Sequence, residues 1–184
     1  RRARLFFVDA LGRIAGRPMW QPEWVTIDDL TGEISGLHTG DRVRLITELY
    51  KVYSAYHNEP FDKFYFWGDM LLTDFDTIDK YLIDAQLRIL SFWSSFGEQA
   101  DLSEEKRRFL AIWKTLGPIY RRFRERLSSL GIAYNGMVQR AAVDRIREGA
   151  YAFPEARRYV VAGFNALSEC EKQLFRFLST AAET

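Results

Sequence analysis

The chain has 184 residues, which is enough for one domain of ordinary size. Hydrophobic residues make up 47% and charged residues 28%, a composition that excludes a disordered chain. Lysine and arginine (26) nearly balance aspartate and glutamate (25), so any binding to nucleic acid would need a local basic patch. No apolar run approaches the roughly 20 residues of a membrane-spanning helix, and one cysteine, Cys170, excludes an internal disulfide. We therefore expect a cytoplasmic protein with no membrane partner.

The N-terminal part of the chain is predicted to alternate between helix and extended structure. Apolar residues at helical spacing predict a helix over 2–15, which ends at Gly16. Residues 24–26 are typical of a short strand, and the threonine at its end is suited to cap a helix over 27–35. Because the chain begins inside a predicted helix, with Arg1 rather than methionine, we expect the parent protein to extend in both directions.

The middle of the chain is predicted to be helical throughout. An aromatic stripe predicts an amphipathic helix over 43–56, and a segment dense in large apolar groups predicts another over 61–72. The pair at 73–74 is expected to break that helix and to cap a further one over 75–90, since both residues prefer to bond their own backbone at a helix start. A long helix is predicted over 103–130.

Pro118 lies inside the long helix and is expected to kink it. A shorter helix is predicted over 137–148, followed by a buried-type strand over 159–162 and by a last helix with a capping box at Ser168 and Glu171.

Strands are thus predicted only near the two ends, around a helical block of more than one hundred residues. This pattern predicts a mainly helical fold in which a helical insertion interrupts an α/β layer.

The residues that could carry catalysis do not form a recognisable site. Aspartates crowd the centre of the chain, at Asp62, Asp69, Asp74, Asp76, Asp79 and Asp84. Those spaced seven apart lie opposite an apolar helix face, which favours a solvated face, and Asp74 is interpreted as a cap. His38 and His57 have no ligand at zinc-site spacing, and the strings of a phosphate loop or a nucleophile elbow are absent. We expect no catalytic residue, no metal ligand and no cofactor in this chain.

Basic residues gather in three clusters: Arg1, Arg2 and Arg4; Lys106, Arg107 and Arg108; and Arg121, Arg122, Arg124 and Arg126. In the last cluster Tyr120 and Phe123 are interleaved, which would suit phosphate contacts together with base stacking on a single strand. An ordinary solvated helix face is the alternative interpretation, because Glu125 is mixed in and the charge of the chain is balanced.

Four segments together resemble a known family: RRARLFF, PEWVTIDDL, FDKFYFWGDMLLTDFDTIDKYLIDA and YVVAGFNALSECEKQLFRFL. They look like the helicase-like region of bacterial PD-(D/E)XK nucleases similar to the B subunit of AddB-type ATP-dependent helicase-nucleases. The resemblance covers essentially the whole chain and implies an inactivated superfamily 1 (UvrD/RecB-like) helicase. It implies that 1–37 belong to a RecA-like 1A region, that 38–156 are a helical 1B-like insertion, and that 157–184 are the return strand and helix of the 1A region.

The resemblance extends to particular residues. In active helicases of this type a similar strand ends in an Asp-Glu pair that holds magnesium, followed by Phe-Gln; here these places look like Ala162, Gly163, Phe164 and Asn165, which implies a degenerate ATPase strand. The string VTIDDL resembles a segment near single-stranded DNA in which Thr26 matches and Asp28 replaces a histidine. The candidate DNA contacts are therefore Arg1, Arg2, Arg4, Thr26, Arg121, Arg122 and Arg124.

The function that these observations favour is a non-catalytic segment of a protein of DNA double-strand break repair, which contributes DNA binding and scaffolding. The resemblance implies single-stranded DNA, the remaining parent domains and a helicase subunit as partners, and a Mg²⁺-dependent PD-(D/E)XK exonuclease elsewhere in the parent. A first alternative is a protein-interaction module in which aromatic residues, especially Tyr50, Tyr53, Trp93 and Trp113, complete a core with other domains. A second is a metal-dependent hydrolase that uses the aspartates between 69 and 84.

Overall fold

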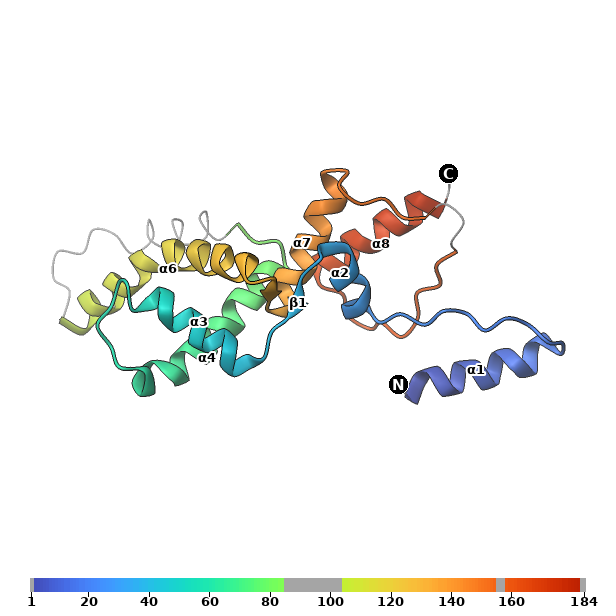
Figure 1. Cartoon of the computed structure of the whole chain (residues 1–184), viewed down its shortest axis with the longest axis horizontal. Coiled ribbons are helices and arrows are strands. Elements are labelled where there is room, and N and C mark those ends of the chain that lie inside the picture. Colours follow the sequence, from blue (N-terminus) through green and yellow to red (C-terminus); the bar gives the residue numbers. More distant parts are fainter. Residues whose placement is uncertain (1, 85–103, 155–157, 183–184) are drawn as a thin grey trace.

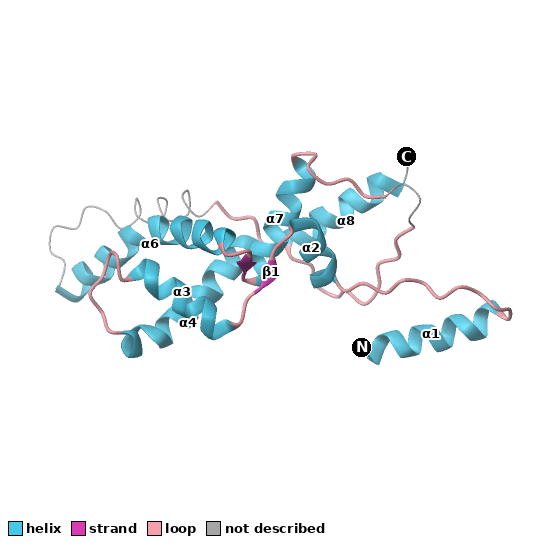
Figure 2. Cartoon of the chain, viewed as in Figure 1, coloured by secondary structure: helices cyan, strands magenta, loops and turns pink. Residues whose placement is uncertain are grey.

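The computed structural model describes residues 2–84, 104–154 and 158–182, and it confirms that the chain is mainly helical (Figures 1 and 2). The helices are α1 (Arg2–Ala15), α2 (Ile27–Ser35), α3 (Arg42–Tyr53), α4 (Phe61–Lys80), α6 (Glu104–Ser129), α7 (Asn135–Arg147) and α8 (Glu169–Ala182). Two short strands, β1 (His38–Thr39) and β2 (Ile132–Ala133), pair in parallel. Within the described ranges, every helix is too short or too polar to cross a membrane.

The main hydrophobic core lies among α3, α4, α6 and the start of α7. Apolar residues recur along α3 at helical spacing, so Ile46 and Leu49 point to the same side and are fully buried. They meet Phe64 of α4 and Phe123 of α6, which are equally buried. Because burial of each such side chain contributes roughly 1.5–3 kcal/mol, this core holds the three helices together as one bundle.

Helix α7 connects the bundle to a second, smaller core. Ala142 of α7 packs with Ile34 of α2 and Leu174 of α8, all of them fully or almost fully buried. At its other end α7 approaches α4 so closely that a Cβ atom on Gly136 would lie 2.2 Å from the carbonyl oxygen of Asp76. The close crossing of α4 and α7 therefore depends on a residue without a side chain.

The predicted start of α2 is confirmed in detail. The Thr26 hydroxyl accepts a hydrogen bond from the backbone N–H of Asp29 at 3.1 Å, and the Asp29 carboxylate accepts from the backbone of Thr26, so the two residues form a capping box. The helix ends at Gly36, whose φ of 71° is the left-handed conformation that glycine adopts most easily. The observed bounds of α2 equal the predicted ones.

The two strands predicted near the chain ends are wrong. Residues 24–26 and 159–162 are irregular, and Val160 in the second segment exposes 92% of its surface, whereas a strand of this composition needs a neighbouring strand and a core to cover it. The observed strands instead precede α3 and follow α6, where two connections run side by side. No sheet joins the two ends within the described part of the chain.

The predicted break at Thr73 and Asp74 is also wrong, because α4 continues through both residues. The Thr73 hydroxyl donates to the carbonyl oxygen of Asp69 at 3.0 Å, four residues earlier, which satisfies the side chain inside the helix. Asp74 is exposed and caps nothing. The helix ends at Lys80, so the helix predicted over 75–90 does not exist as such, and its last residues lie outside the described ranges.

The long helix is confirmed, with Pro118 inside α6. The shorter helix is confirmed as α7, although it begins two residues earlier than predicted, at Asn135, with Tyr134 as its N-cap. The last helix begins as predicted after Ser168, whose backbone N–H donates to Glu171 at 2.7 Å while its hydroxyl accepts from the Glu171 N–H at 3.2 Å. Local signals thus locate helix ends well, and strand pairing depends on residues far apart in sequence.

Candidate functional site

A fully buried acid lies at the centre of the bundle. Asp79, in the last turn of α4, has 0% of its surface exposed. Its carboxylate accepts hydrogen bonds from the hydroxyl groups of Tyr120 and Tyr134 and from Nη1 of Arg140 at 3.2 Å. A second guanidinium, that of Arg124, lies 3.5 Å from the same carboxylate. Because these partners belong to α6, α7 and the residue before α7, one acid ties three helices together.

Burial keeps the two tyrosines of this cluster protonated. It raises the pKa of Tyr120 to about 12 and the pKa of Tyr134 well above its ordinary value, and the charge of Asp79 acts in the same direction. Both phenols therefore stay protonated at neutral pH and donate to the carboxylate. The positive charges of Arg124 and Arg140 in turn balance the negative charge of the Asp79 carboxylate, which a buried carboxylate requires. The role of the cluster is structural: it fixes which face of α6 is turned toward α4 and α7.

The orientation of α6 about its own axis decides which residues of its predicted basic cluster face solvent. Tyr120 and Phe123 are buried, and Arg124 is drawn inward to the buried acid. Arg121 and Arg122 are exposed on the outer side of the helix. The structure therefore separates the cluster into an inward arginine with a structural partner and outward arginines that are accessible to a ligand.

A basic seam runs along the contact between α3 and α6, and we define it as Arg44 and Lys51 of α3 with Arg122 and Arg126 of α6. Cations four or seven residues apart share one face of a helix, so each helix presents its pair to the same side. The acid between them, Glu48, is buried, with 7% of its surface exposed. The seam thus combines four cations with one buried acid, and the exposed Glu125 lies on the neighbouring face of α6.

Contacts within the chain hold the seam in place. Glu48 pairs with Lys51, whose Nζ lies 2.6 Å from Oε1, and with Nε of Arg126 across the helix contact. Burial works to raise the pKa of Glu48, but its hydrogen bonds to these two cations lower the pKa overall, so the residue is ionised at neutral pH. The guanidinium of Arg122 lies 5.3 Å from the ring centroid of Tyr56, three residues beyond the end of α3. Lys51, Arg122 and Arg126 are therefore ordered before any ligand binds.

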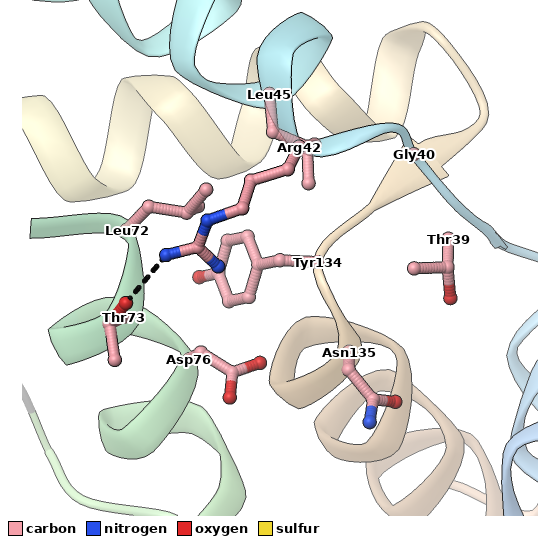
Figure 3. A pocket seen from close by; sticks show the side chains of 9 residues that line it. All are labelled: Thr39, Gly40, Arg42, Leu45, Leu72, Thr73, Asp76, Tyr134 and Asn135. Atoms are coloured by element: carbon pink, nitrogen blue, oxygen red, sulfur yellow. Dashed lines mark hydrogen bonds between the residues drawn. The ribbon is translucent and has the colours of Figure 1, made fainter. Parts of the chain in front are cut away.

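A separate cavity of about 290 Å³ lies between β1, α3, α4 and the start of α7 (Figure 3). Arg42 donates to the Thr73 hydroxyl at 2.9 Å and pairs with Asp69, and Asp76 accepts from a backbone N–H of α7 at 2.6 Å. The buried Oδ1 atom of Asn135 has no hydrogen-bond partner in the described part of the chain. The lining contains one carboxylate, that of Asp76, and neither histidine nor cysteine, and its other polar side chains are two threonines, Tyr134, Asn135 and Arg42.

Metal-ligating side chains do not converge in the part of the chain that the structure describes: no group of three or more His, Cys, Asp or Glu residues could hold an ion there. Three of the central aspartates, Asp69, Asp76 and Asp79, have charged partners within the chain instead. Asp69 pairs with Arg42, and Asp76 lies 2.6 Å from the Nζ atom of Lys80. Among the three aspartates predicted to form a solvated face, Asp62 is exposed and the other two are half-buried.

The candidate DNA contacts from the N-terminal region lie far from the seam. Arg1 is outside the described residues, Arg2 opens α1, and Arg4 is exposed on that helix. The hydroxyl of Thr26 is engaged in the capping box. Figure 1 shows α1 and α6 toward opposite ends of the long axis of the molecule. The structure therefore does not bring the two predicted groups of DNA contacts together.

The segment that resembles a degenerate ATPase strand forms a loop. Ala162, Gly163, Phe164 and Asn165 are exposed and irregular, and they precede α8. The ring of Phe164 lies 5.0 Å from that of Phe175, which fastens this loop to the helix. The segment contains neither aspartate nor glutamate.

The aromatic stripe of α3 lies inside the molecule rather than at its surface. Tyr53 is 2% exposed and donates a hydrogen bond to Glu59, while the half-buried Tyr50 donates to the Glu59 carbonyl oxygen at 2.8 Å. Trp93 and the side chain of Trp113 lie outside the described residues. The described part of the stripe therefore completes the core of this chain itself.

The sequence interpretation missed the role of Asp79. Leu72, Phe75 and Asp79 recur at i, i+3 and i+7, which places the acid on the buried face of α4, and this spacing was the available signal. Glu48 of the seam lies in the same way on the buried side of α3. In both helices, an acid at a position where the spacing of apolar residues predicts burial indicates a positively charged partner on another helix.

Comparisons of the chain with known protein families, with curated proteins and with solved structures give no match. The functional assignment therefore comes from the residues, their geometry and the resemblance of the four segments.

Proposed function

We propose that this chain is a non-catalytic DNA-binding and scaffolding segment of a larger protein, and that the basic seam contacts the phosphates of single-stranded DNA. The observation that carries the proposal is the set of four cations on two packed helices around one buried acid, three of them held by contacts within the chain. A cation that neutralises a phosphate releases a bound counterion, so an ordered row of cations favours a polyanion.

The geometry of the seam fits a flexible strand. Arg44 and Lys51 lie two helical turns apart, which is about 10 Å along the axis at 1.5 Å per residue. Arg122 and Arg126 extend the same positive surface onto the neighbouring helix. The half-buried ring of Tyr56 beside Arg122 adds an aromatic group on which a base could stack.

The wider assignment is part of the same proposal and has different support. The four resembling segments support a place in a bacterial helicase-nuclease of DNA double-strand break repair, with the PD-(D/E)XK exonuclease and its Mg²⁺ in another part of the parent and the cytoplasm as its location. The helical middle agrees in kind with a 1B-like insertion over 38–156. The RecA-like layer around it, over 1–37 and 157–184, is supported by the resemblance alone.

The test is a fluorescence-anisotropy titration of a labelled single-stranded oligonucleotide at several salt concentrations. The seam variant combines Arg44→Ala with Arg122→Ala, because neither residue forms the ion pairs of Glu48. We expect its affinity to fall by about tenfold or more. The slope of log K against log salt should fall by about 1.4, or about 0.7 for each phosphate that the variant no longer neutralises.

The matched control removes two exposed arginines elsewhere, Arg158→Ala with Arg176→Ala, and should change affinity by less than about twofold. Equal losses in both variants, or no binding by the wild-type chain, would contradict the DNA contact. Turnover of ATP with magnesium above background would contradict the non-catalytic role.

A further inference from the structure

Glu48 is an acid that lies among the four cations of the basic seam. Its side chain is on the buried side of α3, with 7% of its surface exposed. A carboxylate inside a surface that binds a polyanion repels the ligand, so its presence there needs a compensating role. The contacts of Glu48 indicate what that role is.

Each carboxylate oxygen of Glu48 holds one cation of the seam. Oε1 accepts a hydrogen bond from Nζ of Lys51 at 2.6 Å, and Oε2 accepts one from Nε of Arg126 across the contact between α3 and α6. Glu48 itself is fixed, because its side chain is buried between the two helices. The two cations therefore flank one immobile carboxylate.

The hydrogen bond to Glu48 occupies only one edge of the Arg126 guanidinium. It uses Nε, and the terminal atoms Nη1 and Nη2 have no acceptor among the described residues. The edge formed by two terminal nitrogens of an arginine matches two oxygens of a phosphate group. Because 40% of the Arg126 side chain is exposed, a ligand can reach this edge.

We propose that Glu48 is a positioning residue, which holds the Arg126 guanidinium so that Nη1 and Nη2 bind two oxygens of one phosphate of the DNA strand. Lys51, on the other oxygen of Glu48, adds a second positive charge at the same place. An arginine side chain loses rotational freedom when it binds, and one that is already fixed has lost it before the ligand arrives. The inference rests on the proposed DNA contact and adds the residue that recognises the shape of a phosphate.

The positioning role reverses the effect that charge alone would have. Glu48→Gln and Glu125→Gln each remove one negative charge near the seam, and Glu125 is exposed on the neighbouring face of α6. A seam that recognised charge alone would bind single-stranded DNA more tightly in both variants. When Glu48 positions Arg126, its replacement weakens binding although the surface becomes more positive.

The test is a fluorescence-anisotropy titration of a labelled single-stranded oligonucleotide with Glu48→Gln, with the matched control Glu125→Gln and with Arg126→Lys. We expect Glu48→Gln to bind about threefold more weakly or worse, and Glu125→Gln to bind as tightly as the wild type or up to about twofold more tightly. Arg126→Lys keeps the charge and loses the paired donors, so its affinity should fall by about fivefold or more. Adding Glu48→Gln to Arg126→Lys should cause no further loss, because the side chain that Glu48 positions is then absent.

Tighter binding by Glu48→Gln, wild-type affinity in Arg126→Lys, or losses that add in full in the double variant would overturn the positioning role and leave the DNA contact standing. A wild-type chain that does not bind the oligonucleotide overturns the DNA contact and this role with it. Thermal unfolding followed by circular dichroism checks that each variant is folded. If Glu48→Gln is not folded, the half-exposed Arg126→Lys decides alone.

Discussion

The bundle of α3, α4, α6 and α7 and the first helix use large apolar residues in opposite ways. In the bundle Phe64 and Phe123 are fully buried, and even the charged Asp79 has partners from three sides. In α1 the row of Phe6 and Ile14 is open to solvent. The comparison indicates that the bundle completes its own core within this chain, whereas none of the described residues covers the apolar row of α1.

The largest expected effect comes from removing the buried acid. Asp79→Ala leaves Arg124 and Arg140 without the carboxylate that balances their charge, and we expect the free energy of unfolding to fall by about 3–5 kcal/mol. Urea denaturation measures the change. The exposed Asp74→Ala on the same helix is the control and should change stability by no more than about 0.5 kcal/mol. Similar losses in both variants would show that the cluster is not a structural centre.

A smaller effect is expected where α4 and α7 cross. Gly136→Ala places a methyl group against the carbonyl of Asp76, so the helices must separate, at a cost of about 1–3 kcal/mol. Gly12→Ala in α1 meets nothing within 4 Å and should raise the helicity of α1 without lowering the melting temperature of the bundle. Thermal unfolding followed by circular dichroism separates the two outcomes. A neutral Gly136→Ala would contradict the close crossing.

The smallest of these effects concerns alkaline pH. The pKa of Tyr120 is raised from 10.0 to about 12, so the folded state favours the neutral phenol. This contribution is present in full below pH 10 and is lost as the pH rises from 10 to 12, by about 1–2 kcal/mol. Unfolding free energies between pH 8 and pH 12 measure it. Tyr120→Phe should lose less over this interval, and an equal loss in both proteins would assign the decline to other groups.

Local signals predicted the helices well because a helix is decided by residues close together in sequence. The capping box of Thr26 and Asp29 and the glycine at position 36 sufficed to define both ends of α2. The strands were misplaced because pairing depends on a partner: His38 pairs with Ile132, more than ninety residues away, and nothing near either residue signals this. The break expected at Thr73 failed because core packing outweighed the preference of that residue for a helix start.

The site was predictable in part. The basic residues of α6 were recognised, but their separation into inward and outward groups depends on Asp79, which lies forty-one residues before Tyr120. The contribution of α3 was not foreseen, since Arg44 and Lys51 look like ordinary surface residues until α6 packs beside them. A surface built from two helices is visible only once their packing is known.

Hydrogen–deuterium exchange, with and without a single-stranded oligonucleotide, tests the proposed DNA interface most directly, because it distinguishes the seam from the N-terminal candidates around Arg4 and Thr26. We predict slower exchange over 42–57 and 115–129 when DNA is added, and unchanged exchange in α1 and at the start of α2. Slower exchange confined to 2–35, or no change anywhere in the chain, would contradict a DNA interface on the basic seam.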